Sequence, residues 1–283
     1  MWTITYEEAN LVSRHRGTLP VILSCPHEGE EQPAGVPERT GSVPGCPPIT
    51  RKNDLHTREI TTRVAQRLLD IFGEAPYVVI AEFHRKYIDA NRPAECAYEV
   101  PAAQQYYDEY HNTLRNFVDE IRAETGGVGL LFDIHGTLVI DEDPADLYLG
   151  TDNRKTVTRL VRFDPQALWR RRGLRGLLGP EAAGYVVSPT QPNKNETKDV
   201  DGGHTVRTYG SSAPDGVDAI QLEIASTLRN DRDKRAAFIE NLAYAIGNFA
   251  ARYVNTESLP TGSRPFIPRR NYAASKRDEK ARD

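Results

Sequence analysis

The chain has 283 residues, of which 39% are hydrophobic and 27% are charged, and these proportions are typical of a soluble globular protein with a sizeable core. Its formal net charge of -4 gives no general electrostatic reason to expect a nucleic-acid or membrane partner. No apolar run approaches the ~18 residues that span a bilayer, and the N-terminal segment lacks the apolar core of a signal peptide.

The cysteines Cys25, Cys46 and Cys96 are an odd and sparse set, which does not suggest a disulfide framework. They predict reduced thiols and a cytoplasmic protein. We expect Cys25 to be buried as a small hydrophobic residue rather than to serve as a ligand.

Short apolar runs alternate with helical patterns along the chain, and this alternation predicts an α/β fold. The expected strands are Pro20–Cys25, Tyr77–Phe83, Val128–Ile134, Tyr185–Ser188 and Ala219–Ala225. They are rich in Val, Ile and Leu, as is typical of strands buried on both faces of a parallel sheet. The expected helices are residues 53–73, with Asn53 or Asp54 as the N-cap and Gly73 as the stop, Ala102–Thr125 and Arg232–Tyr253.

Two long irregular segments lie between these elements. Residues 31–50 are rich in Pro and Gly, and residues 188–204 form a polar stretch that ends in two glycines and a histidine. Loops of this length within a compact domain are often functional. We expect residues 1–256 to form a single domain and residues 257–283 to be an extended, partly flexible tail.

Polar side chains follow the ends of the expected strands, where open α/β sheets bind their ligands. They are His27 and Glu30 after the first strand, Arg85, Asn91 and Arg92 after the second, His135 at the end of the third, and Glu223 within the last. These residues lie far apart in the sequence, and the predicted topology would bring them to one edge of the sheet.

Two histidines and a carboxylate are the ligand set of many catalytic zinc sites, in which a water takes the fourth position. The H-x-x-E spacing of His27 and Glu30 lets one loop offer two ligands, and His135 would be the third. Asp54, in the segment "NDLH", is the alternative to Glu30 as the carboxylate ligand.

A second carboxylate is needed to take a proton from the water in such a site. Glu223 is the candidate, because an acid within an apolar strand calls for an explanation. A core salt bridge with an arginine is the alternative explanation for Glu223. Arginines near the metal could hold a substrate carboxylate or a developing oxyanion, and the candidates are Arg85, Arg92 and Arg207.

Two other kinds of residue are expected to play no direct part in the site. We expect His15 and His111 to be surface residues. We interpret Glu28 and Glu31 as solvated neighbours of the predicted site, with Glu28 close enough to it to influence the choice of substrate.

Six segments together resemble the N-formylglutamate amidohydrolase family, in the same order along the chain. They are "PHEG", "DLH", "RKYIDANRP", "DIHG", "GGHTVRTYG" and "AIQLEIA". The resemblance runs from about Val21 to Ala225, and its most specific parts are the third and fifth segments. The family is similar to the zinc-dependent exopeptidases. It implies a three-layer α/β/α fold with a mixed, mostly parallel central sheet, of the phosphorylase/hydrolase-like, zinc exopeptidase type, and one catalytic zinc ion.

The resemblance also implies roles for single residues. It places His27 and His135 on the metal and Glu223 in the position of the general base. It places Arg92, with Asn91, at the substrate carboxylate, and it places Arg85 and Arg207 in the pocket, with Arg85 as a catalytic group. His204, in the same segment as Arg207, would bind substrate. Glu30 matches the H-x-x-E of carboxypeptidase-like relatives and is favoured as the third ligand on its spacing, whereas Asp54 matches the family pattern in which that acid is missing.

The chain departs from the family pattern next to the predicted site. Glu28 and Gly136 stand where the family commonly has a small residue and a serine, and the loop of residues 189–201 is unusually polar. These departures flank the expected substrate. They weaken the prediction of N-formylglutamate itself more than the prediction of amide hydrolysis.

The sequence therefore predicts a hydrolase with one zinc ion that cleaves an amide bond of a small N-acyl amino acid or another amide that carries a carboxylate. The first alternative is a carboxypeptidase-like metallopeptidase that acts on a peptide or a modified peptide. The second is a metal-free binding protein with the same fold.

Overall fold

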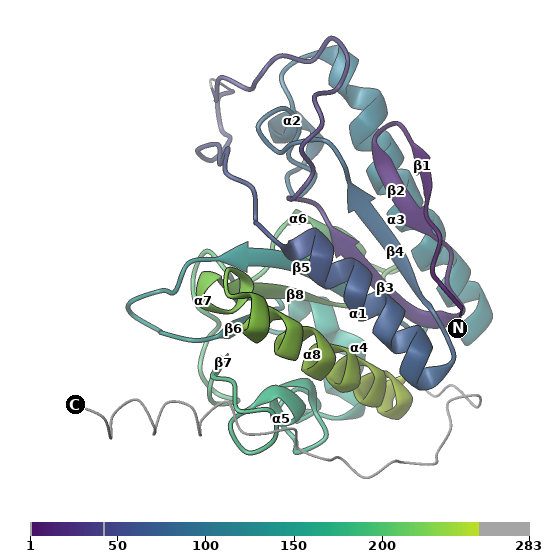
Figure 1. Cartoon of the computed structure of the whole chain (residues 1–283), viewed down its shortest axis with the longest axis vertical. Helices are drawn as coiled ribbons and strands as arrows, with labels where there is room; N and C mark the ends of the chain where they lie inside the picture. The colour runs from purple at the N-terminus through teal and green to yellow at the C-terminus, as the bar shows by residue number, and fades with distance from the viewer. Residues whose placement is uncertain (1, 42, 255–283) are drawn as a thin grey trace.

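The computed structural model describes residues 2–41 and 43–254, and within them an eight-stranded mixed sheet forms the centre of the molecule (Figure 1). The order across the sheet is β1-β2-β4-β3-β5-β8-β6-β7. The strands are β1 (Glu7–Ala9), β2 (Val12–His15), β3 (Leu19–Cys25), β4 (Pro76–Ala81), β5 (Leu130–Thr137), β6 (Leu147–Gly150), β7 (Val187–Ser188) and β8 (Asp218–Ala225). The predicted tail, residues 257–283, lies outside the described residues.

The four central strands β4, β3, β5 and β8 run parallel, and β2 and β6 run antiparallel to them on either side. The carboxyl ends of the four parallel strands therefore meet at one edge, as the sequence predicted. β1, β2 and β6 were not predicted from the sequence. Each has only three or four residues, which is too short for a periodic pattern to stand out.

Helices cover both faces of the sheet, which confirms the predicted three-layer α/β/α architecture. The helices are α1 (Thr57–Phe72), α2 (Ala94–Ala97), η1 (Pro101–Ala103), α3 (Gln104–Thr125), η2 (Lys155–Val157), α4 (Thr158–Phe163), α5 (Leu174–Leu178), α6 (His204–Tyr209), α7 (Ser226–Arg229) and α8 (Arg232–Tyr253). In Figure 1, α1 and α8 lie side by side in front of the sheet, and α3 lies behind β2 and β4. None of the helices in the described ranges is both long and apolar enough to cross a membrane.

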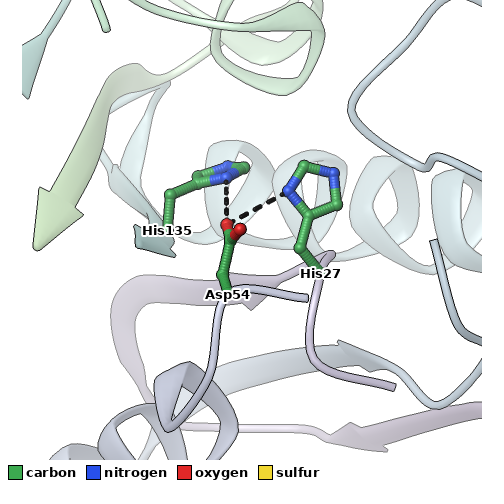
Figure 2. A group of neighbouring side chains, drawn as sticks. All are labelled: His27, Asp54 and His135. Carbon is green, nitrogen blue, oxygen red and sulfur yellow. Dashed lines mark hydrogen bonds and ion pairs between the residues drawn. The ribbon is translucent and has the colours of Figure 1, made fainter. Parts of the chain in front are cut away.

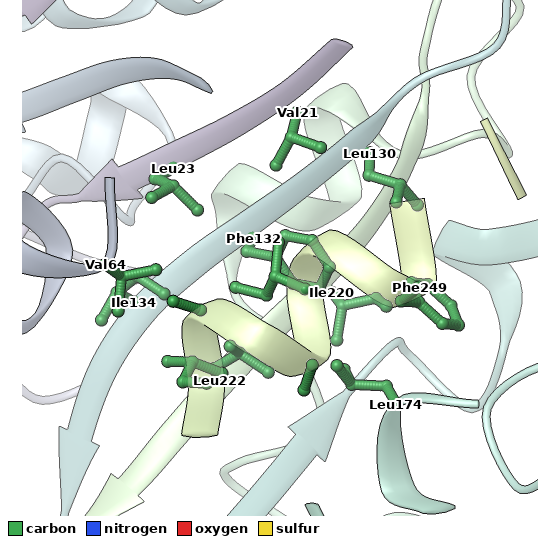
Figure 3. Packing of buried hydrophobic residues seen from close by; sticks show 14 of the residues in the cluster. Val21, Leu23, Val64, Leu130, Phe132, Ile134, Leu174, Ile220, Leu222 and Phe249 are labelled. Atoms are coloured by element: carbon green, nitrogen blue, oxygen red, sulfur yellow. The ribbon is translucent and has the colours of Figure 1, made fainter. Parts of the chain in front are cut away.

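Each face of the sheet has its own apolar core, because the central strands are buried on both sides. On the front face, Leu23, Phe132 and Leu222 pack with Val64 of α1 and Phe249 of α8 (Figure 3). On the other face, the alternate residues of the strands pack against α3. The two cores hold the central strands in a fixed register, so the strand ends have fixed positions for a site.

The start of α1 differs from the predicted N-cap at Asn53 or Asp54. The helix begins at Thr57, and His56 precedes it in the left-handed conformation, with φ 70°. The carboxylate of Glu28 accepts hydrogen bonds from the main-chain N–H groups of His56 and Arg58, so Glu28 caps the helix and is not the solvated neighbour that the sequence predicted. The side chain of Asp54 therefore does not cap the helix.

The prediction of reduced cysteines is wrong for two of the three. Cys46 and Cys96 form a disulfide bond, with their Cα atoms 5.5 Å apart and 50 residues between them in the sequence. The fold brings residues 31–53 across α2, a long-range contact that cysteine spacing cannot reveal. Cys25 is a buried free thiol as predicted, and burial raises its pKa to about 12. The cysteines therefore give no support to a reducing compartment.

Candidate functional site

His27, Asp54 and His135 meet at the carboxyl edge of the sheet (Figure 2). His27 follows β3, His135 lies near the end of β5, and Asp54 lies in the loop before α1. The main-chain N–H of Asp54 donates to the carbonyl of His27 at 3.0 Å, which fixes this loop beside the end of β3. All three side chains are buried, and one potential ligand atom of each lies within 4.8 Å of the others.

The spacing of these atoms fits a tetrahedral metal ion. Oδ2 of Asp54 lies 3.3 Å from Nδ1 of His27 and 3.4 Å from Nδ1 of His135. Two ligand atoms that are each ~2.0–2.1 Å from a tetrahedral ion lie about 3.4 Å apart. The donor set of two imidazoles and a carboxylate is also that of many zinc sites. The three residues therefore form a group that could hold a metal ion.

Two further carboxylates fix the orientation of the imidazoles. Nε2 of His27 lies 2.7 Å from Oδ1 of Asp89, and Nε2 of His135 lies 2.7 Å from Oδ2 of Asp133. A carboxylate only accepts hydrogen bonds, so Asp89 and Asp133 each accept from Nε2, and Nδ1 of each ring faces Asp54. Ser24 in turn donates to Asp133 at 2.6 Å. Neither Asp89 nor Asp133 was assigned a role from the sequence.

Asp54 is ionised in this environment. Burial acts to raise its pKa, but hydrogen bonds from His135 and His27 and the positive charge of Arg85 outweigh that effect and hold the pKa well below its ordinary value. Nη1 of Arg85 lies 3.2 Å from Asp54, and Nη2 lies 3.0 Å from Asp89. Arg85 is thus bound to two carboxylates in the wall of the site.

The structure places Asp54, and not Glu30, beside the two histidines. Glu30 is exposed and lies outside the buried group that Asp54 completes. Gly29 packs so tightly that a Cβ there would lie 2.2 Å from the carbonyl carbon of Glu82. The N–H of Glu31 then donates to the carbonyl of Glu82 at 2.9 Å, so the chain continues alongside the end of β4. Glu30 could lie beside His27 only if the chain turned back at Gly29, and it does not turn there.

Glu223 lies directly opposite His135 in the parallel register of β5 and β8. Its side chain is 8% exposed and lines the cavity described below, and its Oε1 accepts a hydrogen bond from Gln221 at 2.8 Å. Burial raises the pKa of Glu223, and the charge of His135 opposes that rise. Within the described residues no ion pair involves Glu223, which removes the alternative of a core salt bridge.

A cavity of about 960 Å³ opens over this group. Apart from Glu30, it is lined by every residue that the sequence placed in the site, namely His27, Asp54, Arg85, Asn91, Arg92, His135, His204, Arg207 and Glu223. Residues 199–203 form one wall, at the end of the polar loop that the sequence singled out. Asp143 and Glu196 hold this loop in place through hydrogen bonds that include Lys194 to Asp143 at 2.7 Å and Thr151 N to Glu196 at 2.8 Å.

The cationic groups of the cavity differ in how far they are neutralised. Arg92 makes no ion pair within the part of the chain that the structure describes. Arg207, on α6, is about half exposed and lies 3.7 Å from Asp152 and 3.6 Å from Asp201. Arg92 is therefore the guanidinium in the cavity that is most available to an anionic ligand.

His111 is not the surface residue that the sequence predicted. Burial lowers its pKa to about 4, so the ring is neutral. Its Nε2–H donates to the carbonyl of Ala90 at 3.0 Å, and the hydroxyl of Tyr209 lies 2.9 Å from its Nδ1. One turn earlier on α3, the hydroxyl of Tyr107 donates to the carbonyl of Arg92 at 2.9 Å. Helix α3 thus fixes the turn that carries Asn91 and Arg92.

We expect Tyr107→Phe to raise KM about fivefold and to change kcat less than about twofold, because the substitution removes the hydrogen bond to the Arg92 carbonyl and the 3.3 Å contact with Nε2 of His204. Steady-state kinetics with a substrate that bears a carboxylate measures both constants. Tyr106→Phe is the matched control, since the Tyr106 hydroxyl is bonded to Ala34 at 3.2 Å on the outer side of α3. Equal effects of the two substitutions on KM would contradict the positioning role.

Asn91 and Arg229 complete the description of the cavity wall. Oδ1 of Asn91 accepts the N–H of Thr205 at 2.8 Å, and Nδ2 lies 3.3 Å from His135. Arg229, which the sequence reasoning missed, is 5% exposed and lines the cavity from α7. No local pattern marks it, because two of its three carbonyl partners, those of Leu55 and Thr137, lie far away in the sequence.

Comparisons with known proteins agree with the predicted family and fold. The family model described as N-formylglutamate amidohydrolase matches residues 97–229. N-formylglutamate deformylase of Pseudomonas putida is 27% identical over 274 residues, which cover 82% of this chain and 90% of that protein. The resemblance that the sequence motifs predicted is confirmed.

Two solved structures share the fold. N-formylglutamate amidohydrolase from Ralstonia eutropha JMP134 superposes with a TM-score of 0.60 at 18% identity, over 87% of this chain and 99% of that one. A gene product of Agrobacterium tumefaciens superposes with a TM-score of 0.54 at 18% identity, over 86% of this chain and 96% of that one. The likeness therefore spans nearly the whole of both known folds.

Proposed function

Since this chain resembles the N-formylglutamate amidohydrolase family, we propose that it is a zinc-dependent hydrolase that cleaves an amide bond of a small N-acyl amino acid. We place the catalytic domain at residues 1–256, because a single sheet carries the groups of the site. The observation that carries the proposal is the buried group of His27, Asp54 and His135 with Glu223 beside it in the same cavity.

His27, Asp54 and His135 would hold the zinc ion, with Nδ1 of each imidazole and Oδ2 of Asp54 as the donor atoms. A zinc ion in such a site supplies Lewis acidity, which lowers the pKa of a bound water and polarises a carbonyl group. Asp89 and Asp133 orient the imidazoles by accepting hydrogen bonds from Nε2, and Arg85 keeps Asp54 and Asp89 ionised.

Glu223 would accept the proton from the attacking water and pass it to the nitrogen of the leaving amine. Its burial raises its pKa above the ordinary value of a glutamate, and a carboxyl with a raised pKa exchanges protons more readily near neutral pH. Glu223 pairs with His135 across β5 and β8, so it lies beside the three residues that would hold the metal ion.

Arg92 would bind the substrate carboxylate, because it lines the cavity without an ion-pair partner among the described residues. Asn91, His204 and Arg207 would complete the polar wall around the amino-acid part of the substrate. The Pseudomonas relative is named for N-formylglutamate, and an N-acylated acidic amino acid is the substrate class that this wall suits.

The proposal is tested by measuring bound zinc in the purified protein and the hydrolysis of N-formyl- and N-acyl-L-glutamate, before and after removal of metal with a chelator. We expect about one zinc per chain, loss of activity in the chelated protein and recovery on addition of zinc. A protein with no stoichiometric zinc and no hydrolysis would instead be a binding protein on this fold. Faster cleavage of peptides than of N-acyl amino acids would favour the carboxypeptidase-like alternative.

A further inference from the structure

Two leucines that are open to solvent lie in or next to the wall of the cavity. Leu138 lines the cavity and is 74% exposed. Leu55 is 53% exposed and is not itself a lining residue, but it directly follows Asp54, which is. Most other large apolar side chains of the described residues are packed in the two cores. Exposed leucines beside a ligand cavity are a feature of surfaces that an apolar ligand covers.

Arg229 joins the two segments that carry these leucines. It donates from Nη1 to the carbonyl of Leu55, from Nη2 to the carbonyl of Thr137 at 3.2 Å, and from Nε to the carbonyl of Ile224 at 2.8 Å. Leu138 directly follows Thr137, so the guanidinium holds the main chains at Leu55 and Leu138 close together. The carbonyl groups of Leu55 and Thr137 are thereby satisfied.

Gly136 makes room for this arrangement. A Cβ at residue 136 would lie 2.4 Å from Cζ of Arg229, so a larger residue would displace the guanidinium. The absence of a side chain at Gly136, one of the departures from the family pattern, therefore accompanies the placement of Arg229 against β5.

Leu138 and Arg92 line the same cavity as the two imidazoles. Nδ1 of each ring faces Asp54, which precedes Leu55 and whose Oδ2 accepts the N–H of Gly136 at 3.1 Å. The Nε2 atoms face the other way, that of His27 toward Asp89 and that of His135 toward Asp133 and Asn91. A substrate whose carboxylate lies at Arg92 and whose amide lies over His27, Asp54 and His135 would extend its acyl group toward Leu138, which lines the same cavity.

We propose that Leu138 and Leu55 form an acyl subsite that accepts an aliphatic acyl chain several carbons long, so that the substrate is an N-acyl amino acid larger than a formyl derivative. This inference rests on the proposed function and names the substrate class of the same site. The cavity of about 960 Å³ is near the upper end of the ~300–1,000 Å³ found for ligand pockets and leaves room for such a chain.

The test compares kcat/KM for N-formyl-, N-acetyl-, N-butyryl- and N-hexanoyl-L-glutamate with the zinc-loaded protein. Full burial of a methylene corresponds to about fourfold in binding, and a half-covered methylene at the cavity mouth to about twofold. We therefore expect kcat/KM to rise about tenfold from the acetyl to the hexanoyl substrate. In Leu138→Ser and in Leu55→Ser, this hexanoyl-to-acetyl ratio is expected to fall about threefold or more.

Phe163→Ser is the matched control, because Phe163 is as exposed as Leu138, at 74%, but does not line the cavity. The control should keep the wild-type ratio, and melting curves should show that all variants are folded. A wild-type preference for formyl over hexanoyl, or an unchanged ratio in both leucine variants, would overturn the acyl subsite while the hydrolase function stands. Faster cleavage of N-acetyl-leucyl-glutamate than of the hexanoyl substrate would overturn the aliphatic assignment. A lack of hydrolysis of every N-acyl-glutamate would overturn the proposed function and the subsite together.

Discussion

Glu223→Gln is expected to lower kcat by about three orders of magnitude and to leave KM within about twofold of the wild-type value. Glutamine has nearly the same shape as glutamate and can still accept the hydrogen bond that Gln221 donates at 2.8 Å. It cannot take up a proton, so the attacking water would lose its acceptor and the leaving amine its donor. Steady-state hydrolysis of an N-acyl-glutamate, with zinc content measured in parallel, gives both constants.

Glu30→Gln is the matched control for this experiment. It makes the same chemical change at an exposed glutamate outside the cavity, and we expect kcat and KM to stay within about twofold of the wild type. Retention of more than about a tenth of the wild-type kcat in Glu223→Gln, with zinc still bound, would contradict the role of Glu223 as proton acceptor. A loss of zinc together with kcat would point to a structural role for Glu223 instead.

The central part of the fold could be predicted because its strands carry their signal locally. β3, β5 and β8 are mostly apolar and are buried along nearly their whole length, and α8 matches its predicted bounds, Arg232–Tyr253. β7 is shorter than its predicted run, because only Val187 and Ser188 pair with β6. The pairing of strands at the margins of the sheet depends on the strand that lies alongside. The sequence of a short segment does not show which strand that is.

The residues of the site could largely be predicted because they follow strands whose carboxyl ends share one edge. That rule brought His27, His135 and Glu223 together before any geometry was known. It could not decide between Glu30 and Asp54. The decision depends on the path of the chain after His27, which is set by the close packing of Gly29 on the carbonyl of Glu82.

Contacts between buried polar groups are the part of the site that the sequence could not show. Arg229 binds the carbonyl of Leu55, which lies 174 residues earlier, and the disulfide links two segments that the sequence separates by 50 residues. Asp89 and Asp133 stood near candidate residues in the sequence, but a carboxylate beside a histidine has no signature until the ring orientation is known.

The choice between Asp54 and Glu30 makes the second strong prediction. We expect Asp54→Asn to weaken zinc binding by more than about 100-fold. Loss of a residue that only hydrogen-bonds to a metal ligand already lowers metal affinity by about 10–100-fold, and Asp54 would be a ligand itself. Asparagine keeps the shape of Asp54 but removes the charge that lies 3.3 Å from His27 and 3.4 Å from His135. Competition with a chromophoric zinc chelator measures the affinity directly, without any assumption about the substrate.

Thermal unfolding gives an independent reading of the same prediction. A ligand that binds only the folded state stabilises it by about 2.7 kcal/mol at 100 times its Kd. Zinc should therefore raise the Tm of the wild type and of Glu30→Gln equally, and it should raise the Tm of Asp54→Asn much less at the same concentration. If Glu30→Gln lost the zinc-dependent shift and Asp54→Asn kept it, the H-x-x-E spacing would have identified the ligand correctly, and the chain after Gly29 would have to turn back toward His27 when zinc binds.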